Sequence, residues 1–116
     1  MTIDQIEKRI GKIKTELAEI QDMRPGSLSR QYNVCGVKGC RCKDAIAPKK
    51  HGPYTQLSYV HQGKSTTRFI RPHQVQVVRS QLAVYKRFRK LTQDWLHLAI
   101  EHAQLKLELT RNNAAK

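Results

Sequence analysis

Acidic residues are almost absent from the centre of this sequence. Residues 24–90 contain fifteen Lys and Arg but a single acid, Asp44. Residues 1–23 carry four basic and five acidic residues, and residues 91–116 carry three of each, so the centre holds the whole excess of positive charge. Uncompensated like charge destabilises a compact state unless a polyanion offsets it. We therefore interpret the centre as a nucleic-acid-binding surface.

Long apolar runs are also lacking. No stretch approaches the roughly 20 apolar residues of a membrane span, and the N-terminus alternates Ile with charge instead of forming the apolar core of a signal peptide. We expect a cytoplasmic protein without a membrane partner. Only 39% of the 116 residues are hydrophobic, so the core is thin and should need a metal or a partner chain for stability.

Cysteine is rare, with three residues in the chain, and all three lie within eight positions. In a reducing compartment, thiols this close together are more often metal ligands than disulfide partners. Cys35, Cys40, Cys42 and His51 supply three thiolates and an imidazole, enough for one tetrahedral Zn²⁺. The alternative is that His51 is a turn residue, in which case His61, water or a partner chain completes the shell.

Two helices and a hairpin are expected around this loop. Apolar residues from Ile3 to Ile20 recur at alternating spacings of three and four, which is the seam of a short coiled coil within or between chains. Tyr54 to Ile70 forms two β-rich runs joined through Gln62-Gly63-Lys64. From Pro72 an apolar stripe continues over about 40 residues, and its second half pairs with the first helix.

The expected fold is therefore an α-rich α+β single domain, 1–116. It consists of a helix over 3–23, a metal loop over 24–53, a β-hairpin over 54–70 and a long helix over 72–111. The two helices form an antiparallel helical hairpin or coiled coil, through which the chain also forms a homodimer.

The sequence favours a binding function over an enzymatic one. Gly63-Lys64-Ser65-Thr66 imitates the end of a phosphate-binding loop, but the glycine that this motif needs at position 58 is Ser58. A Cys–His nucleophile pair is formally available, yet three clustered thiols suit a metal better than one activated nucleophile. We expect no catalytic residue.

Phosphate contacts should come from the basic residues of the loop and the hairpin. Tyr32, Tyr54 and Tyr59 are interleaved with them and either stack on unpaired bases or pack in the hairpin. The predicted nucleic-acid-binding residues are Arg30, Lys38, Arg41, Lys43, Lys49, Lys50, Lys64, Arg68, Arg71 and Arg79.

The motifs Cys35-Gly-Val-Lys-Gly-Cys-Arg-Cys, His51-Gly-Pro-Tyr-Thr-Gln-Leu-Ser and Gly63-Lys-Ser-Thr-Thr-Arg-Phe-Ile occur in this order. In them the chain resembles a family of small bacterial and archaeal proteins known as a domain of unknown function, over residues 23 to 95. The resemblance implies that four residues match positions of the family's motifs: Cys35, Cys40, Cys42 and His51. It also implies an association with mobile elements, and it implies no activity.

We conclude from the sequence that this is a zinc-stabilised nucleic-acid-binding protein, with DNA slightly preferred over RNA. It would act mainly on the phosphate backbone, as an accessory or regulatory factor of a mobile element. The competing interpretation is a coiled-coil adaptor that recruits a protein partner to a nucleoprotein complex.

Overall fold

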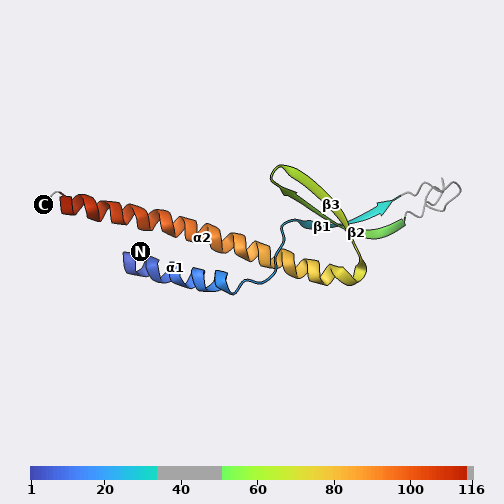
Figure 1. Cartoon of the computed structure of the whole chain (residues 1–116), viewed down its shortest axis with the longest axis horizontal. Coiled ribbons are helices and arrows are strands. Elements are labelled where there is room, and N and C mark those ends of the chain that lie inside the picture. Colours follow the sequence, from blue (N-terminus) through green and yellow to red (C-terminus); the bar gives the residue numbers. More distant parts are fainter. Residues whose placement is uncertain (34–50, 115–116) are drawn as a thin grey trace. The chain divides into compact units, whose positions relative to one another are not determined.

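The computed structural model describes residues 1–33 and 51–114, and its elements are shown in Figure 1. Helix α1 covers Ile3–Ala18, and strands β1, β2 and β3 cover Ser27–Asn33, His51–His61 and Lys64–Ile70. A 3₁₀ turn, η2, covers Pro72–Gln74, and helix α2 covers Val75–Ala114. The predicted α+β fold class is confirmed. Within the described residues, no helix is both long enough and apolar enough to cross a membrane.

The chain divides into two compact units. Residues 1–22 and 84–116 form the helical unit, and residues 23–83 form the sheet unit. Each unit contains a part of α2, because that helix extends through the boundary at residue 84.

Helix α1 begins where the sequence predicted. The Thr2 side chain accepts a hydrogen bond from the Gln5 backbone N–H at 3.2 Å, and the Thr2 backbone N–H donates to the Gln5 side chain at 3.0 Å. This capping box satisfies two backbone groups that a helix start leaves unpaired. The helix ends earlier than predicted, at Ala18 instead of residue 23, because the N–H groups of Glu19 and Ile20 turn back to the Glu16 and Leu17 carbonyls.

The apolar seam of α1 is covered by the chain's own α2. Ile6 and Ile13 are buried in one cluster with Leu91 and Leu98. Half-buried side chains of both segments surround this cluster, including Ile20, which lies beyond the end of the helix. The apolar repeat therefore continues beyond the end of α1, because Ile20 still packs on the core. This explains why the helix predicted from the sequence is too long.

In the helical unit, polar contacts join an early residue of α1 to a late residue of α2, and a later residue of α1 to an earlier residue of α2. Glu7 and His102 are hydrogen-bonded at 3.0 Å, and the Lys14 ammonium lies 5.4 Å from the centre of the Trp95 ring. The hydrogen bond from His102 lowers the pKa of Glu7 below its ordinary value, and the charges of His102 and Lys106 act in the same direction. Early positions of α1 thus contact late positions of α2.

The sheet unit contains an antiparallel sheet in the order β1-β2-β3 (Figure 1). β2 and β3 form the predicted hairpin, and its connecting residues Gln62 and Gly63 both have positive φ, at 52° and 77°. Two central residues with positive φ are typical of a two-residue turn that matches the twist of paired strands. The hairpin starts at His51 instead of residue 54.

Strand β1 was not predicted. The sequence assigned residues 24–53 to a metal loop, but Ser27–Asn33 pairs antiparallel with β2, from Ser27 opposite Ser58 to Asn33 opposite His51. Gly26 precedes it with φ of 123°, and a Cβ there would lie 2.6 Å from the Ser58 carbonyl oxygen. The strand depends on this long-range pairing, because its own sequence carries only one strongly apolar residue, Leu28, ahead of Tyr32.

The start of the second helix is close to the prediction. Pro72 occupies the first turn, as expected for a residue without an N–H group, but that turn is 3₁₀ and α2 proper starts at Val75. The helix ends at Ala114 instead of residue 111.

Candidate nucleic-acid interface

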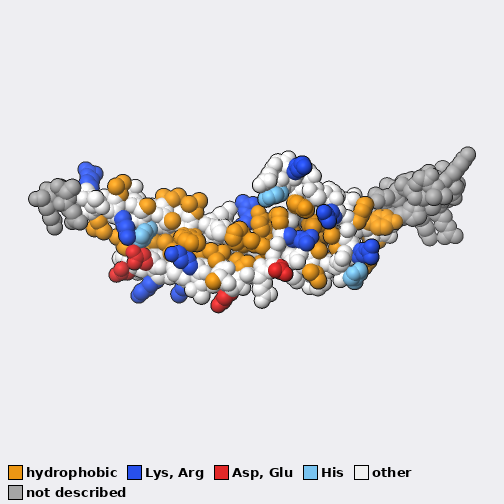
Figure 2. Space-filling model, in the orientation of Figure 1, with side chains coloured by type: hydrophobic (Ala, Val, Ile, Leu, Met, Phe, Trp, Pro, Cys, Tyr) orange, Lys and Arg blue, Asp and Glu red, His pale blue; other side chains and the backbone are white. Residues whose placement is uncertain are grey.

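The described part of the sheet unit has no carboxylate side chain. Residues 23–33 and 51–83 hold six Lys and Arg and no Asp or Glu. On the face shown in Figure 2, acidic side chains lie over α1 and the segment after it, and none lies over the three strands. The ion pairs found among the described residues all involve the helical unit. The cations of the sheet unit are therefore available to an external anion.

One face of the sheet forms the core of this unit. Leu28, Leu57 and Arg68 occupy one rung across the three strands, and Arg30, Thr55 and Ile70 occupy the next. Leu57 is fully buried on the central strand. Because the residues of one rung share a face, the burial of Leu57 fixes the side on which Arg30 and Arg68 lie.

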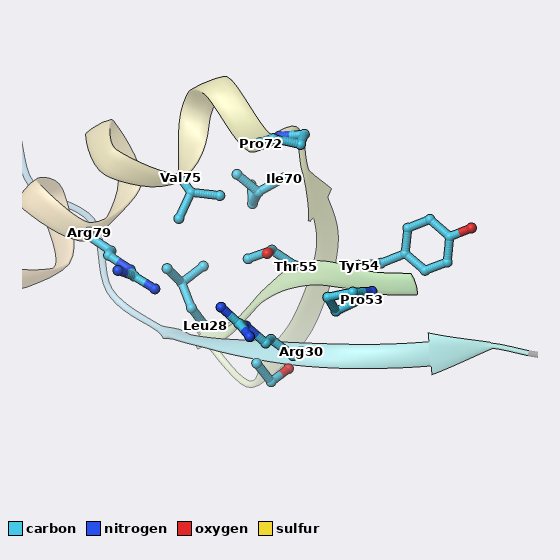
Figure 3. A pocket seen from close by; sticks show the side chains of 10 residues that line it. Leu28, Arg30, Pro53, Tyr54, Thr55, Ile70, Pro72, Val75 and Arg79 are labelled. Atoms are coloured by element: carbon cyan, nitrogen blue, oxygen red, sulfur yellow. The ribbon is translucent and has the colours of Figure 1, made fainter. Parts of the chain in front are cut away.

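Arg30 and Arg79 share a hollow on this side of the sheet. The hollow measures about 570 Å³ and is lined by β1, the start of β2, the end of β3 and the first turns of α2. In Figure 3 the side chains of Arg30 and Arg79 both extend toward Leu28, while the Tyr54 ring points away from the hollow. The sequence had placed both arginines in the binding surface, and the fold brings them together from positions 49 residues apart.

Arg24 and Arg68 line two further hollows of about 390 and 490 Å³. The hollow of about 390 Å³ is also lined by Tyr59 and His61. The hollow of about 490 Å³ is also lined by His73 and Gln81. The Arg24 backbone N–H donates to the Gln81 carbonyl at 3.2 Å, which ties the segment before β1 to α2.

Two buried polar atoms in the second of these hollows, Arg24 Nε and Gln81 Oε1, have no hydrogen-bond partner among the described residues. A buried donor without a partner costs free energy. Because Arg24 Nε is closed to solvent, an external phosphate could reach this guanidinium only through its terminal nitrogens.

The other predicted residues are distributed as follows. Lys64 opens β3 directly after the hairpin turn, and Arg71 is the N-cap residue of η2. His51 begins β2, opposite Asn33. The predicted residues that lie outside the described part of the chain are Cys35, Lys38, Cys40, Arg41, Cys42, Lys43, Lys49 and Lys50.

The zinc ligands therefore stay a prediction. Among residues 1–33 and 51–114, no group of three or more His, Cys, Asp or Glu side chains is placed to hold a metal ion, and every cysteine lies outside these ranges. Three of the four predicted ligands are cysteines, so the structure does not test the site.

Sequence reasoning missed Arg24 and Phe69. Arg24 directly follows the helix predicted over 3–23, and only its backbone contact with α2 shows that it lines a hollow together with Arg68. Phe69 alternates with Ser65 and Thr67 along β3, and period two in the expected strand was the signal that could have placed it on their face.

Comparison of the sequence with protein families finds a family model that matches the part of the chain from α1 to the start of α2. The match is to the domain of unknown function DUF6788, and it covers residues 3–80. Neither the curated proteins nor the solved structures contain a match. The expectation of a family known only as an uncharacterised domain is confirmed. Since residues 3–80 make up more than half of the chain, this protein belongs to the DUF6788 domain family.

Proposed function

We propose that this protein binds nucleic acid through its sheet unit, mainly by contacts to phosphates and with DNA slightly preferred over RNA. The observation that carries the proposal is the lack of any carboxylate in residues 23–33 and 51–83, where Arg24, Arg30, Arg68 and Arg79 line hollows. A soluble surface normally mixes charges of both signs.

Arginine is well suited to this role. Its planar guanidinium presents several donors in a fixed fork and can bind two phosphate oxygens at once. The Arg30–Arg79 hollow also contains apolar walls from Leu28, Ile70 and Val75, which can contact a sugar while the guanidinium groups bind the backbone. Such contacts fix a protein on nucleic acid without reading its sequence.

The test is binding of labelled DNA at a series of salt concentrations, measured by fluorescence anisotropy. The Arg30→Gln/Arg79→Gln double variant should reduce the slope of log K against log salt by about two, one for each lost phosphate contact. The matched control is Lys8→Gln/Lys12→Gln, which removes the same charge from exposed positions of α1.

The control variant should keep the slope of the parent protein. If the two double variants lower the affinity and the slope equally, net charge and not the sheet unit determines binding. If the parent protein binds no DNA or RNA, the proposal is wrong.

We also propose that Cys35, Cys40, Cys42 and His51 hold a structural Zn²⁺. The register of β1 and β2 supports this, because Asn33 and His51 are opposite each other and residues 34–50 must connect these two neighbouring positions. A metal held by ligands from this segment would add its binding free energy to the stability of the fold.

Elemental analysis of the purified protein tests the zinc site. We expect about one zinc per chain and loss of β-structure on chelation, because metal affinity is folding free energy in small metal sites. Protein purified without chelator that contains no metal, with three freely reactive thiols, would end this proposal.

The second candidate function is a helical interaction module, in which α1 and the end of α2 form an antiparallel helical hairpin that associates with a second copy. Leu96, Ile100 and Leu107 are 62%, 63% and 64% exposed, and with Ala103 they follow spacings of four, three and four along α2. This is the repeat of a coiled-coil seam, and none of its four members is charged.

Sedimentation of the Leu96→Ser/Ile100→Ser variant tests this association. A parent dimer that becomes a folded monomer would support the homodimer. A parent protein that is already a monomer would contradict it.

A further inference from the structure

The face of the sheet opposite Leu57 carries exposed aromatic rings. We call it the polar sheet face and define it by alternate strand positions: Ser27, Ser29, Gln31, Tyr54, Gln56, Ser58, Val60, Ser65, Thr67 and Phe69. Phe69 is 63% exposed and Tyr54 is 42% exposed. Exposed aromatic side chains on a sheet are typical of an interaction site.

Contacts between side chains confirm that these residues share one face. The Tyr54 and Phe69 rings meet edge to face with their centres 6.1 Å apart. The hydroxyls of Ser58 and Thr67 are 3.4 Å apart, and the Gln31 amide donates to the Ser29 hydroxyl at 3.2 Å. Figure 3 shows the Tyr54 ring pointing away from the hollow on the other side of the sheet.

None of the ten side chains on this face is charged. Seven of them are Ser, Thr or Gln, and each carries groups that both donate and accept hydrogen bonds. Hydroxyls and amides of this kind match the mixed donors and acceptors on the edges of nucleobases, and an aromatic ring matches their flat surfaces.

We propose that the polar sheet face binds the unpaired bases of a single-stranded nucleic acid, with one base stacked on Phe69 and a neighbouring base on Tyr54. The inference rests on the proposed function and deepens it by naming the form of nucleic acid. Lys64 and Arg71 lie at the two ends of β3, where they can bind phosphates of the same strand.

A single strand fits this face better than a duplex or a protein does. The flat surfaces of paired bases are hidden inside a duplex, so Phe69 and Tyr54 would meet only its sugars and phosphates. A protein partner would be expected to bury a mainly apolar centre, whereas this face offers two rings and Val60 among seven polar side chains.

The test compares a labelled oligo(dT) of about 20 nucleotides with a duplex of the same length. Phe69→Leu and Tyr54→Leu keep apolar bulk but remove the stacking ring. Each should weaken binding to oligo(dT) by about 5- to 150-fold, and binding to the duplex by less than about twofold. Phe69→Trp should restore oligo(dT) binding.

Val60→Ala is the matched control, because Val60 is 65% exposed on the same face without an aromatic ring. It should leave oligo(dT) binding unchanged. Circular dichroism verifies that each variant is folded, and if Phe69→Leu does not fold, the exposed Tyr54→Leu carries the test.

Two results distinguish a failure of the proposed function from a failure of the base-stacking role. If the parent protein binds neither probe, the proposed function itself is wrong. If the parent binds oligo(dT) and both Leu variants bind it as tightly, nucleic-acid binding stands but the polar sheet face is not its base-binding surface. An equal loss of oligo(dT) and duplex binding would also overturn the stacking role.

Discussion

Substitution of Ile6 tests the central packing contact of the helical unit. Ile6 is fully buried in the cluster with Ile13, Leu91 and Leu98, so its side chain connects α1 to α2 of the same chain. Ile6→Ala removes three carbon atoms from this cluster. Because α1 has only two fully or nearly buried residues, the loss should affect the whole unit.

The expected cost follows from burial. Each buried methylene contributes about 0.8 kcal/mol, so three groups account for about 2.4 kcal/mol. The cavity left behind adds to this figure, and Ile→Ala in a core costs about 2–5 kcal/mol in total. We expect Ile6→Ala to lower the free energy of unfolding by about 3–4 kcal/mol. Leu109→Ala, at a position 52% exposed on α2 and outside the proposed dimer seam, should cost less than about 1 kcal/mol.

Urea denaturation followed by tryptophan fluorescence measures both variants. Trp95 is the only tryptophan and packs against the Ile6 cluster, so its emission reports on the helical unit. If Ile6→Ala and Leu109→Ala shift the unfolding free energy by the same small amount, α1 does not pack through this face. The Ile repeat would then be packed neither within the chain nor between chains, and both explanations of it would be refuted.

Two further predictions concern glycine and pH. Gly26→Ala should destabilise the sheet unit by at least about 2 kcal/mol, because φ is 123° and the added Cβ would meet the Ser58 carbonyl oxygen at 2.6 Å. Gly11→Ala, in α1 with nothing within 4 Å of its Cβ, should instead stabilise by up to about 1 kcal/mol, and thermal unfolding of both variants checks the contrast. The pKa of Glu7 is lowered in the folded state, so its contribution to stability is complete above its ordinary value of about 4.5 and is lost as pH falls through the lowered pKa. Glu7→Gln should lack this part of the acid dependence in unfolding curves recorded from neutral pH downward, and an unchanged dependence would show that the Glu7–His102 hydrogen bond does not form in solution.

Local signals determined the parts of the fold that the sequence predicted well. The Thr2–Gln5 capping box fixes the start of α1, and Gln62-Gly63 fixes the turn between β2 and β3. Pro72 sets the start of the second helical segment. Each of these devices acts within about four residues, so no distant contact is needed to interpret it.

The parts that were missed depend on distant partners. Strand β1 exists through its pairing with β2, whose residues lie 18 to 31 positions away in the register. The end of α1 is set by a turn at Glu19 and Ile20, although the apolar repeat continues through Ile20. The local sequence alone could not decide either element. The residues of β1 are compatible with a loop or a strand, and those at the end of α1 are compatible with a helix or a turn.

The same distinction between local sequence and distant contacts applies to the candidate site. The sequence by itself determined that the centre is basic and nearly free of acids, because charge is a property of composition. Only the tertiary structure decided that Arg30 and Arg79 line one hollow, that Arg24 and Arg68 line another, and that Phe69 and Tyr54 share one face. The physical reason is that strand register and the packing of a helix on a sheet, which depend on the whole unit, decide which distant side chains become neighbours.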